Sequence, residues 1–374
     1  MTKYLPPLSL YIHIPWCIYK CHYCDFNSHQ IKNTLPEKEY ITALLADLEQ
    51  ELPKIKGRSI NSIFIGGGTP SVLSADMITR LISGVKLPIT SNAEITMEVN
   101  PGTVNRLQGF YAAGINRLSL GIQSFNDSYL KKLGRIHNSF EAKQAIEIAK
   151  QVGFNNINLD LMFGLPGQTI TDALEDLHTA INYQPSHLSW YQLTIEPNTF
   201  FHTKPPKNLP DDSLLWEIQI AGQKYLAAQG YSQYEISAYT KDKQCKHNLN
   251  YWKFGDYLGI GAGAHSKITT DNEITRFSKP NHPNAYLKNI DAIEPRILTK
   301  EDIVLEFMMN ALRLLDGFTE AEFTKNTGLD IGYIEQPLQQ AYAKGWLKKN
   351  HKSISATENG ICFLNNVLEL FMLN

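Results

Sequence analysis

The stretch Pro15–Phe26, PWCIYKCHYCDF, contains three of the five cysteines of this chain, Cys17, Cys21 and Cys24, in the spacing C-x3-C-x2-C. It follows an apolar, β-branched run, Ser9–Pro15 (SLYIHIP), that is typical of a buried strand. Five cysteines are too few for a disulfide framework in 374 residues. Three thiols crowded directly after a strand therefore indicate a metal or redox site.

Three interpretations compete for these cysteines. A zinc site would take His13, His22 or His29 as its fourth ligand, but structural zinc usually draws on two separated ligand pairs, and no second pair is present. Three idle thiols are disfavoured because the residues between them do not form an apolar face. A [4Fe–4S] cluster normally takes one thiolate on each iron, so three cysteines would leave one iron open to bind another molecule. We favour this third interpretation.

The composition, 43% hydrophobic and 19% charged, is that of an ordinary folded protein, and the length allows more than one domain. A formal net charge of -2 gives no general reason to expect nucleic acid as a partner. We find no apolar run of membrane-spanning length and no signal-peptide pattern at the N-terminus. We therefore expect a cytoplasmic protein without a transmembrane segment, and peripheral membrane contact stays open.

The first two-thirds of the chain alternates apolar runs with helical patterns, which predicts right-handed βαβ crossovers and a parallel sheet. In the helical pattern Glu37–Leu52, Thr34 and Glu37 are expected to form a capping box. Six such units with helices on one side predict a partial, open barrel, and a doubly wound sheet is the alternative. The six predicted strands are Ser9–Pro15, Ser62–Gly68, Glu94–Pro101, Arg117–Ser124, Asn156–Pro166 and His187–Ile195.

We expect three domains. Residues 1–235 would form the barrel, and residues 236–295 a β-rich extension of antiparallel strands with a connector. Residues 296–374 read as three helices and a hairpin, which resembles a winged helix. DNA binding by this last domain is disfavoured, because residues 300–374 contain seven Lys or Arg against ten Asp or Glu. Cys362 is expected to be a plain core residue.

Polar residues follow several predicted strands where each one ends. Gly66-Gly67-Gly68-Thr69 ends the second strand, Glu98 the third and Gln123 the fourth, and Asp160 lies on the fifth. The carboxyl ends of barrel strands meet at one mouth, so we expect these groups to converge there. Glycines let a ligand approach the backbone closely, although a tight turn would also explain them.

Seven motifs occur in order: YIHIPWC, CDFNSH, GGGTP, EVNP, GIQSF, LDLMFGLPGQT and HNLNYW. With them the chain resembles the radical S-adenosylmethionine (SAM) superfamily, and within it the oxygen-independent coproporphyrinogen III oxidase family, over essentially its whole length. The resemblance implies a partial (β/α)6 barrel, a [4Fe–4S] cluster on Cys17, Cys21 and Cys24, and SAM bound to the open iron. It also implies SAM contacts at Tyr11, Tyr23, Gly67, Gly68, Thr69, Glu98, Gln123, Arg135 and Asp160.

The chain departs from the decarboxylating oxidases of that family at two places. The oxidases have a fourth cysteine two residues after the third, where this sequence has Phe26, and they have a longer N-terminal extension. The chain is therefore more similar to the heme-chaperone branch, which implies heme as cargo and heme-acceptor proteins, respiratory or iron-storage, as partners. Oxidative decarboxylation, or another radical SAM reaction, stays the alternative, and no catalytic residue is assigned.

The motif Cys245–Trp252 (CKHNLNYW) is where the resemblance implies heme binding. His247 is the favoured iron ligand and Cys245 the second candidate, because an imidazole or a thiolate can bind heme iron. From the residues alone, a lone histidine beside two aromatic residues is more often a hydrogen-bonded core residue.

Overall fold

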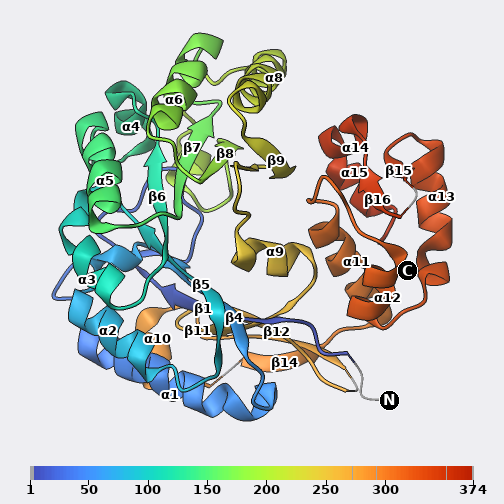
Figure 1. The fold of residues 1–374 in the computed structure, drawn as a ribbon, viewed down its shortest axis with the longest axis horizontal. Coiled ribbons are helices and arrows are strands. Elements are labelled where there is room, and N and C mark those ends of the chain that lie inside the picture. The colour runs from blue at the N-terminus through green and yellow to red at the C-terminus, as the bar shows by residue number, and fades with distance from the viewer. Residues whose placement is uncertain (1–3, 272, 292, 351, 373–374) are drawn as a thin grey trace.

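The computed structural model describes residues 4–271, 273–291, 293–350 and 352–372. A twelve-stranded sheet curves into an open barrel, and a smaller helical unit lies beside it (Figure 1). The strand order is β14-β13-β12-β11-β1-β4-β5-β6-β7-β8-β10-β9. This arrangement confirms the predicted α/β class with a partial barrel and a C-terminal helical unit.

Six consecutive parallel strands form the barrel wall, and each overlaps one of the six predicted runs. Most of their side chains are buried, because helices cover the outer face of the wall. The strands are β1 (Leu8–Ile14), β4 (Ile60–Gly67), β5 (Ile89–Val99), β6 (Arg117–Gln123), β7 (Ile157–Phe163) and β8 (His187–Gln192).

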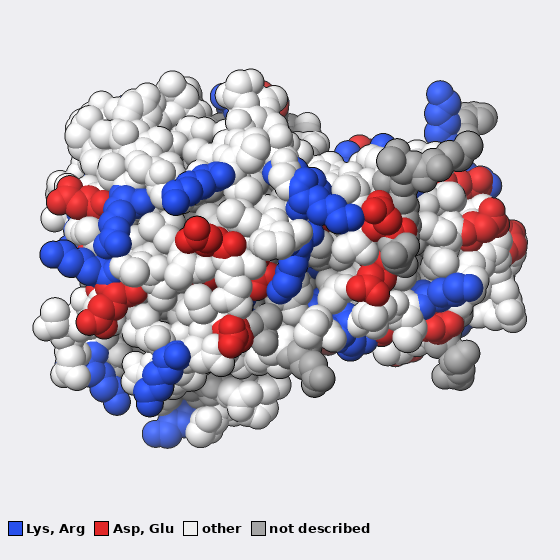
Figure 2. Space-filling view, turned by 90° about the horizontal axis from the view of Figure 1, so that it is seen from below, with Lys and Arg blue, Asp and Glu red and all other residues white. Residues whose placement is uncertain are grey.

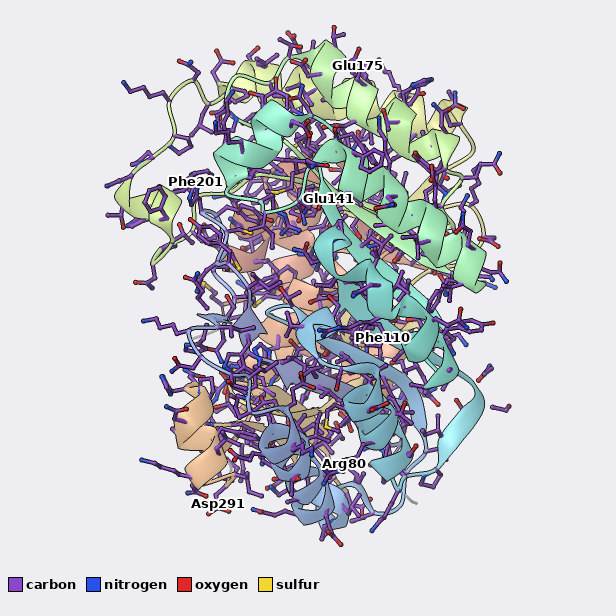
Figure 3. All side chains as sticks on the ribbon, turned by 90° about the vertical axis from the view of Figure 1, so that its left-hand side faces the viewer. Arg80, Phe110, Glu141, Glu175, Phe201 and Asp291 are labelled. Atoms are coloured by element: carbon purple, nitrogen blue, oxygen red, sulfur yellow. The ribbon has the colours of Figure 1, made fainter. Side chains whose placement is uncertain are left out.

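One layer of helices covers the outside of this wall, which favours the barrel over the doubly wound alternative (Figure 1). Arg80, Phe110, Glu141 and Glu175 mark four helices of the layer, α2, α3, α5 and α6, in Figure 3. The layer comprises α1 (Glu37–Ile55), α2 (Ala75–Gly84), α3 (Leu107–Ala112), α4 (Asp127–Leu133), α5 (Ser139–Val152), α6 (Ile170–Asn182) and α8 (Asp212–Ala228), with η1 (Pro70–Val72) and η2 (Pro101–Arg106) in the connections.

The predicted capping box of α1 is wrong. Pro36 is the N-cap residue, and no side chain caps the helix. The Glu37 carboxylate instead accepts hydrogen bonds from the Ser74 backbone N (3.0 Å) and Oγ (2.6 Å). The Glu37 side chain, which the local pattern assigned to the cap, therefore makes a tertiary contact with the start of α2 instead.

The predicted extension continues the barrel sheet at both edges. A hairpin of β9 (Ser232–Glu235) and β10 (Ala238–Thr240) adds to β8, so the predicted boundary at 235/236 falls within a single sheet. Strands β12, β13 and β14 are antiparallel as expected, but β11 runs parallel to β1. The remaining elements of this region are α9 (Lys246–Trp252), β11 (Asp256–Ile260), β12 (His265–Thr269), β13 (Ile274–Ser278), α10 (Pro283–Lys288) and β14 (Ile293–Ile297).

The C-terminal unit has its own core, in which Phe307, Phe318 and Phe323 pack together. The expected three helices and hairpin are present, followed by two short helices. Cys362 is exposed on the first of these, so its predicted core position is wrong. The elements are α11 (Lys300–Ala311), α12 (Glu320–Thr327), η3 (Ile331–Ile334), α13 (Glu335–Ala343), β15 (Leu347–Lys349), β16 (Ile354–Ala356), α14 (Glu358–Cys362) and α15 (Leu364–Glu369).

Positive and negative side chains are interspersed over the face seen from below in Figure 2. Among the described residues, none of the helices is both long enough and apolar enough to cross a membrane.

We expect Gly222→Ala, on α8, to lower the free energy of unfolding by about 1–3 kcal/mol. Alanine normally stabilises a helix by up to about 1 kcal/mol relative to glycine, so the loss of stability expected here is opposite to the usual effect of this substitution. The reason is that a Cβ at this position would lie 1.9 Å from the Trp190 ring, which is buried against β7. Urea denaturation measures the change. Ala227→Gly, at an exposed position of the same helix, is the control, and a more stable Gly222→Ala would contradict the packing described here.

Candidate functional site

A cavity of about 450 Å³ opens at the carboxyl ends of the barrel strands. It brings together ten of the thirteen residues predicted for the site, which supports the expectation that the strand ends converge. They are Cys17, Tyr23, Cys21, Cys24, Gly68, Thr69, Glu98, Gln123, Arg135 and Asp160.

Backbone hydrogen bonds hold the cysteine loop over this cavity. Two short parallel strands, β2 (Trp16–Cys17) and β3 (His29–Gln30), close the loop at its base. His22 N donates to Leu133 O (3.1 Å), and its carbonyl accepts from Phe201 N (3.0 Å). Phe201 belongs to α7 (Phe200–Thr203), which projects beside the barrel mouth (Figure 3). The loop is therefore anchored to α4 and α7 as well as to its own base.

The three histidines considered as zinc ligands are engaged elsewhere. His13 Nε2 bonds Asn27 O (2.8 Å), His22 Nδ1 bonds Lys132 O (3.1 Å), and His29 Nε2 bonds Asn27 Oδ1 (3.3 Å). Within the described part of the chain, no three His, Cys, Asp or Glu side chains are placed to hold a single metal ion. In a [4Fe–4S] cluster each sulfur ligand binds a different iron, so the thiols need not converge on one point. The arrangement weighs against zinc.

The cysteine thiols lie in surroundings that disfavour free thiolates. Burial raises the pKa of Cys17 and of Cys24 above the usual range of a thiol. A bound metal would reverse this preference, because it takes the place of the proton on sulfur and the proton is released to solvent. The Arg135 guanidinium also donates a hydrogen bond from Nη1 to Cys21 Sγ at 3.4 Å.

The glycine run supports the cysteine loop. A Cβ on Gly68 would lie 2.6 Å from Trp16 O and 3.0 Å from Cys17 Sγ, so a side chain there would displace the loop. Gly67 has φ +115°, a conformation that glycine adopts without strain. Its backbone N donates to Glu98 Oε2 (3.0 Å). Close packing against the cysteine loop and a positive φ therefore account for glycine at these two positions without any bound ligand.

Arg135 offers the cavity an unused hydrogen-bond donor. Its Nη2 donates to Gly121 O at 2.7 Å. Its Nε is buried and has no hydrogen-bond partner among the described residues. A buried donor without an acceptor costs free energy, which a bound carboxylate would recover. The arginine therefore fits the role that the resemblance implies.

Two carboxyl groups, Glu98 and Asp160, also line the cavity. Burial, and then the charge of Asp160, raises the pKa of Glu98 to about 8. Asp160 accepts hydrogen bonds from Ser119 Oγ (2.9 Å) and Asn158 Nδ2 (2.8 Å), and burial raises its pKa as well. Acidic groups held in this way suit an ammonium or hydroxyl donor from a ligand. Together with the thiols and the free Arg135 donor, the residues present fit a [4Fe–4S] cluster with SAM.

We expect Glu98→Gln to become more stable relative to the wild type as the pH is raised from about 4.5 to about 8. Below this window Glu98 is protonated in both the folded and the unfolded chain. Within it the unfolded chain loses the proton while the folded chain keeps it, so the wild type loses up to about 1.4 kcal/mol per pH unit. Glutamine does not titrate and can still accept the bond from Gly67. Urea denaturation across this range measures the difference, and parallel curves for the two proteins would contradict the raised pKa.

Sequence reasoning missed Tyr191, which also lines the cavity. Its hydroxyl donates to Gln123 Oε1 (2.7 Å), while Gln123 itself has φ +68°, an unusual backbone conformation for a residue with a side chain. The alternation along β8 could have indicated Tyr191, because Ser189, two residues earlier, faces the same interior.

Three predicted site residues do not line this cavity. Tyr11 and Gly67 line a second cavity of about 470 Å³, which shares Glu98 and Phe26 with the first. Phe26 is 57% exposed at this shared rim. His247 lines neither cavity, and Tyr11 is the predicted residue its ring approaches, at 6.4 Å between centroids.

His247 is a hydrogen-bonded core residue in this fold. It is 1% exposed, its Nδ1 bonds Ser62 Oγ (3.0 Å), and its Nε2 bonds Tyr251 Oη (2.9 Å). Burial lowers its pKa to about 3. Cys245 is also buried, with its thiol against Glu94, and burial raises its pKa to about 12. Neither side chain offers a free ligand atom.

Comparison with known proteins shows the family of the chain. Residues 11–180 match the radical SAM superfamily, and residues 298–363 match the HemN C-terminal domain. The heme chaperone HemW of Haemophilus influenzae is 53% identical, over 98% of this chain and 98% of its own. That of Escherichia coli K12 is 50% identical, over 98% and 99%.

A solved structure, the coproporphyrinogen III oxidase HemN of Escherichia coli, described as a radical SAM enzyme, superimposes with a TM-score of 0.83. It covers 98% of this chain and 90% of its own at 23% identity, so the likeness shows the fold alone. The identity to the HemW proteins, in contrast, extends over nearly the full length of both chains. The chain therefore belongs to the HemW family of radical SAM proteins.

Proposed function

We propose that this chain is a heme chaperone that holds a [4Fe–4S] cluster on Cys17, Cys21 and Cys24, binds SAM on the open iron, and delivers heme to acceptor proteins. The observation that carries the proposal is Phe26, exposed on the rim between the two cavities. In the oxidases a fourth cysteine is expected at this position. A phenyl ring cannot ligate metal or take part in proton transfer, but it can contact an apolar cargo.

The chain's own residues would divide the binding of the cofactors. The three thiolates hold the cluster, which supplies one-electron chemistry when bound. The Arg135 fork would pair with the carboxylate of SAM, and Glu98 with the glycine backbone would bind its amine. Asp160, fixed by Ser119 and Asn158, accepts from the ribose hydroxyls.

The cargo and its destination follow from the family. The similar proteins of Haemophilus influenzae and Escherichia coli are named heme chaperones, and we extend that activity to this chain. Respiratory or iron-storage proteins are the proposed acceptors. Under this proposal the cluster and SAM control heme transfer, and the chain does not decarboxylate a porphyrinogen.

An anaerobic assay tests the proposal. The reconstituted protein is given SAM, dithionite and coproporphyrinogen III, with an authentic oxidase as the positive control, and a parallel sample is titrated with heme and then mixed with a heme-free acceptor. We expect stoichiometric heme binding, transfer to the acceptor and no protoporphyrinogen. Formation of protoporphyrinogen would make the chain an oxidase despite Phe26, and the absence of heme binding would end the chaperone proposal.

A further inference from the structure

The second cavity has the character of a site for a flat, apolar ligand. Aromatic side chains dominate its walls, among them Tyr251 and Trp252 of α9 and Tyr257 of β11. Aromatic rings offer large apolar faces on which a porphyrin can stack. The indole Nε1 of Trp252 is buried without a hydrogen-bond partner among the described residues.

Most of the side chains on this cavity that could bind heme iron are already engaged. His13 uses both ring nitrogens, Nδ1 with Tyr11 Oη (2.9 Å) and Nε2 with Asn27 O. The Tyr251 hydroxyl is bonded to His247, and the Tyr257 hydroxyl accepts from Arg276. Ligation by any of them would first break a hydrogen bond in the wall.

His265 differs from these groups. It lies at the start of β12, lines the cavity and is exposed, whereas the rest of the strand is buried. Its imidazole makes no hydrogen bond to any residue that the structure describes. Partial burial, and then the charge of Arg276, lowers its pKa, which keeps the ring neutral near pH 7. A neutral imidazole with an unused nitrogen is the form that binds heme iron.

We propose that heme binds in the second cavity, stacked on its aromatic wall, with His265 as the axial ligand to the iron in place of the predicted His247. This inference rests on the proposed heme-chaperone function and gives that cargo its place. It also sets the heme beside the SAM cavity, since the two cavities share Glu98 and Phe26. His247 would then position the wall and not ligate the iron, because its hydrogen bond fixes the hydroxyl of Tyr251, which lines the cavity.

Hemin titration of the reconstituted, SAM-loaded protein tests the assignment, with affinity, the Soret absorbance and the electron paramagnetic resonance spectrum as readouts. Three variants are compared: His265→Ala, His247→Ala and His178→Ala, the last being exposed on α6 away from both cavities. We expect His265→Ala to lose about tenfold or more in affinity and to lose the histidine-ligated spectrum. Added imidazole should restore that spectrum. His247→Ala should keep its ligation signature, and His178→Ala should match the wild type.

The outcomes separate the two claims. A wild-type protein that binds no hemin would overturn the proposed function, and this inference with it. A wild-type protein that binds hemin, together with an unchanged spectrum in His265→Ala, would overturn the ligand assignment alone. Both His265→Ala and His247→Ala could lose the spectrum. If imidazole then restores it in His265→Ala and not in His247→Ala, the assignment is supported. If imidazole restores it in His247→Ala and not in His265→Ala, the assignment is refuted. Iron and sulfide content, measured on each variant, shows that the barrel has kept its cluster.

Discussion

Cys21→Ser is expected to remove the visible absorbance of the iron–sulfur cluster and to lower bound iron from about four per chain to nearly none. The proposed cluster has three protein ligands, so no other cysteine can replace a lost one at the cavity. Serine is close to cysteine in size, and its hydroxyl can still accept the hydrogen bond that Arg135 Nη1 donates to Cys21. A loss of iron would therefore reflect the missing ligand and not a collapsed loop.

Cys362→Ser is the matched control, because Cys362 is a free thiol exposed on α14, in the C-terminal unit. It should retain full iron and sulfide. Metal analysis of both variants also tests the zinc alternative, which would give about one zinc per chain and no sulfide. Full iron and sulfide in Cys21→Ser would refute the ligand set.

The barrel could be predicted from the sequence because its strands are buried on both faces. A run such as Ile157–Phe163 is apolar apart from Asn158 and Asp160, and these two polar residues indicate a polar interior. The polar strand ends could be placed at one mouth for the same reason: parallel strands bring their carboxyl ends to one side. These inferences use only local pattern and topology.

Long-range pairing could not be predicted in this way. Strand β11 lies parallel to β1, with Tyr11 opposite Gly259. Neither segment contains a local sequence signal that identifies the other as its pairing partner. This pairing builds the wall of the second cavity, so the sequence could not show that Tyr11 faces it. The motif placed Tyr11 among the SAM contacts, and that placement stays a prediction.

His247 illustrates the same limit at a single residue. Its bond to Tyr251, four positions later on α9, could have been anticipated from helical spacing. Its bond to Ser62 joins residues 185 positions apart and depends on how α9 packs against β4. With both nitrogens engaged, the histidine that the motif favoured has no free ligand atom. Only the folded structure separates it from His265.

Arg135→Lys is expected to weaken SAM binding by about 10- to 100-fold, the equivalent of losing one charge-assisted hydrogen bond of about 1.5–3 kcal/mol. Lysine keeps the positive charge, but it cannot present the two parallel donors that a carboxylate accepts from a guanidinium. The buried Nε, which has no partner among the described residues, is the donor whose loss should matter most. Anaerobic calorimetric titration of the reconstituted protein with SAM measures the change.

Iron content separates this effect from damage to the cluster, because Arg135 also contacts Cys21. Full iron with weakened SAM binding would place the arginine on the cofactor. A loss of iron would instead show that Arg135 is needed mainly to position the cysteine loop. Arg80→Lys, at an exposed position on α2 where the guanidinium bonds Thr42, should leave both quantities unchanged. Unchanged SAM affinity with full iron in Arg135→Lys would remove Arg135 from the SAM site, and its unpartnered Nε would then need another ligand to explain it.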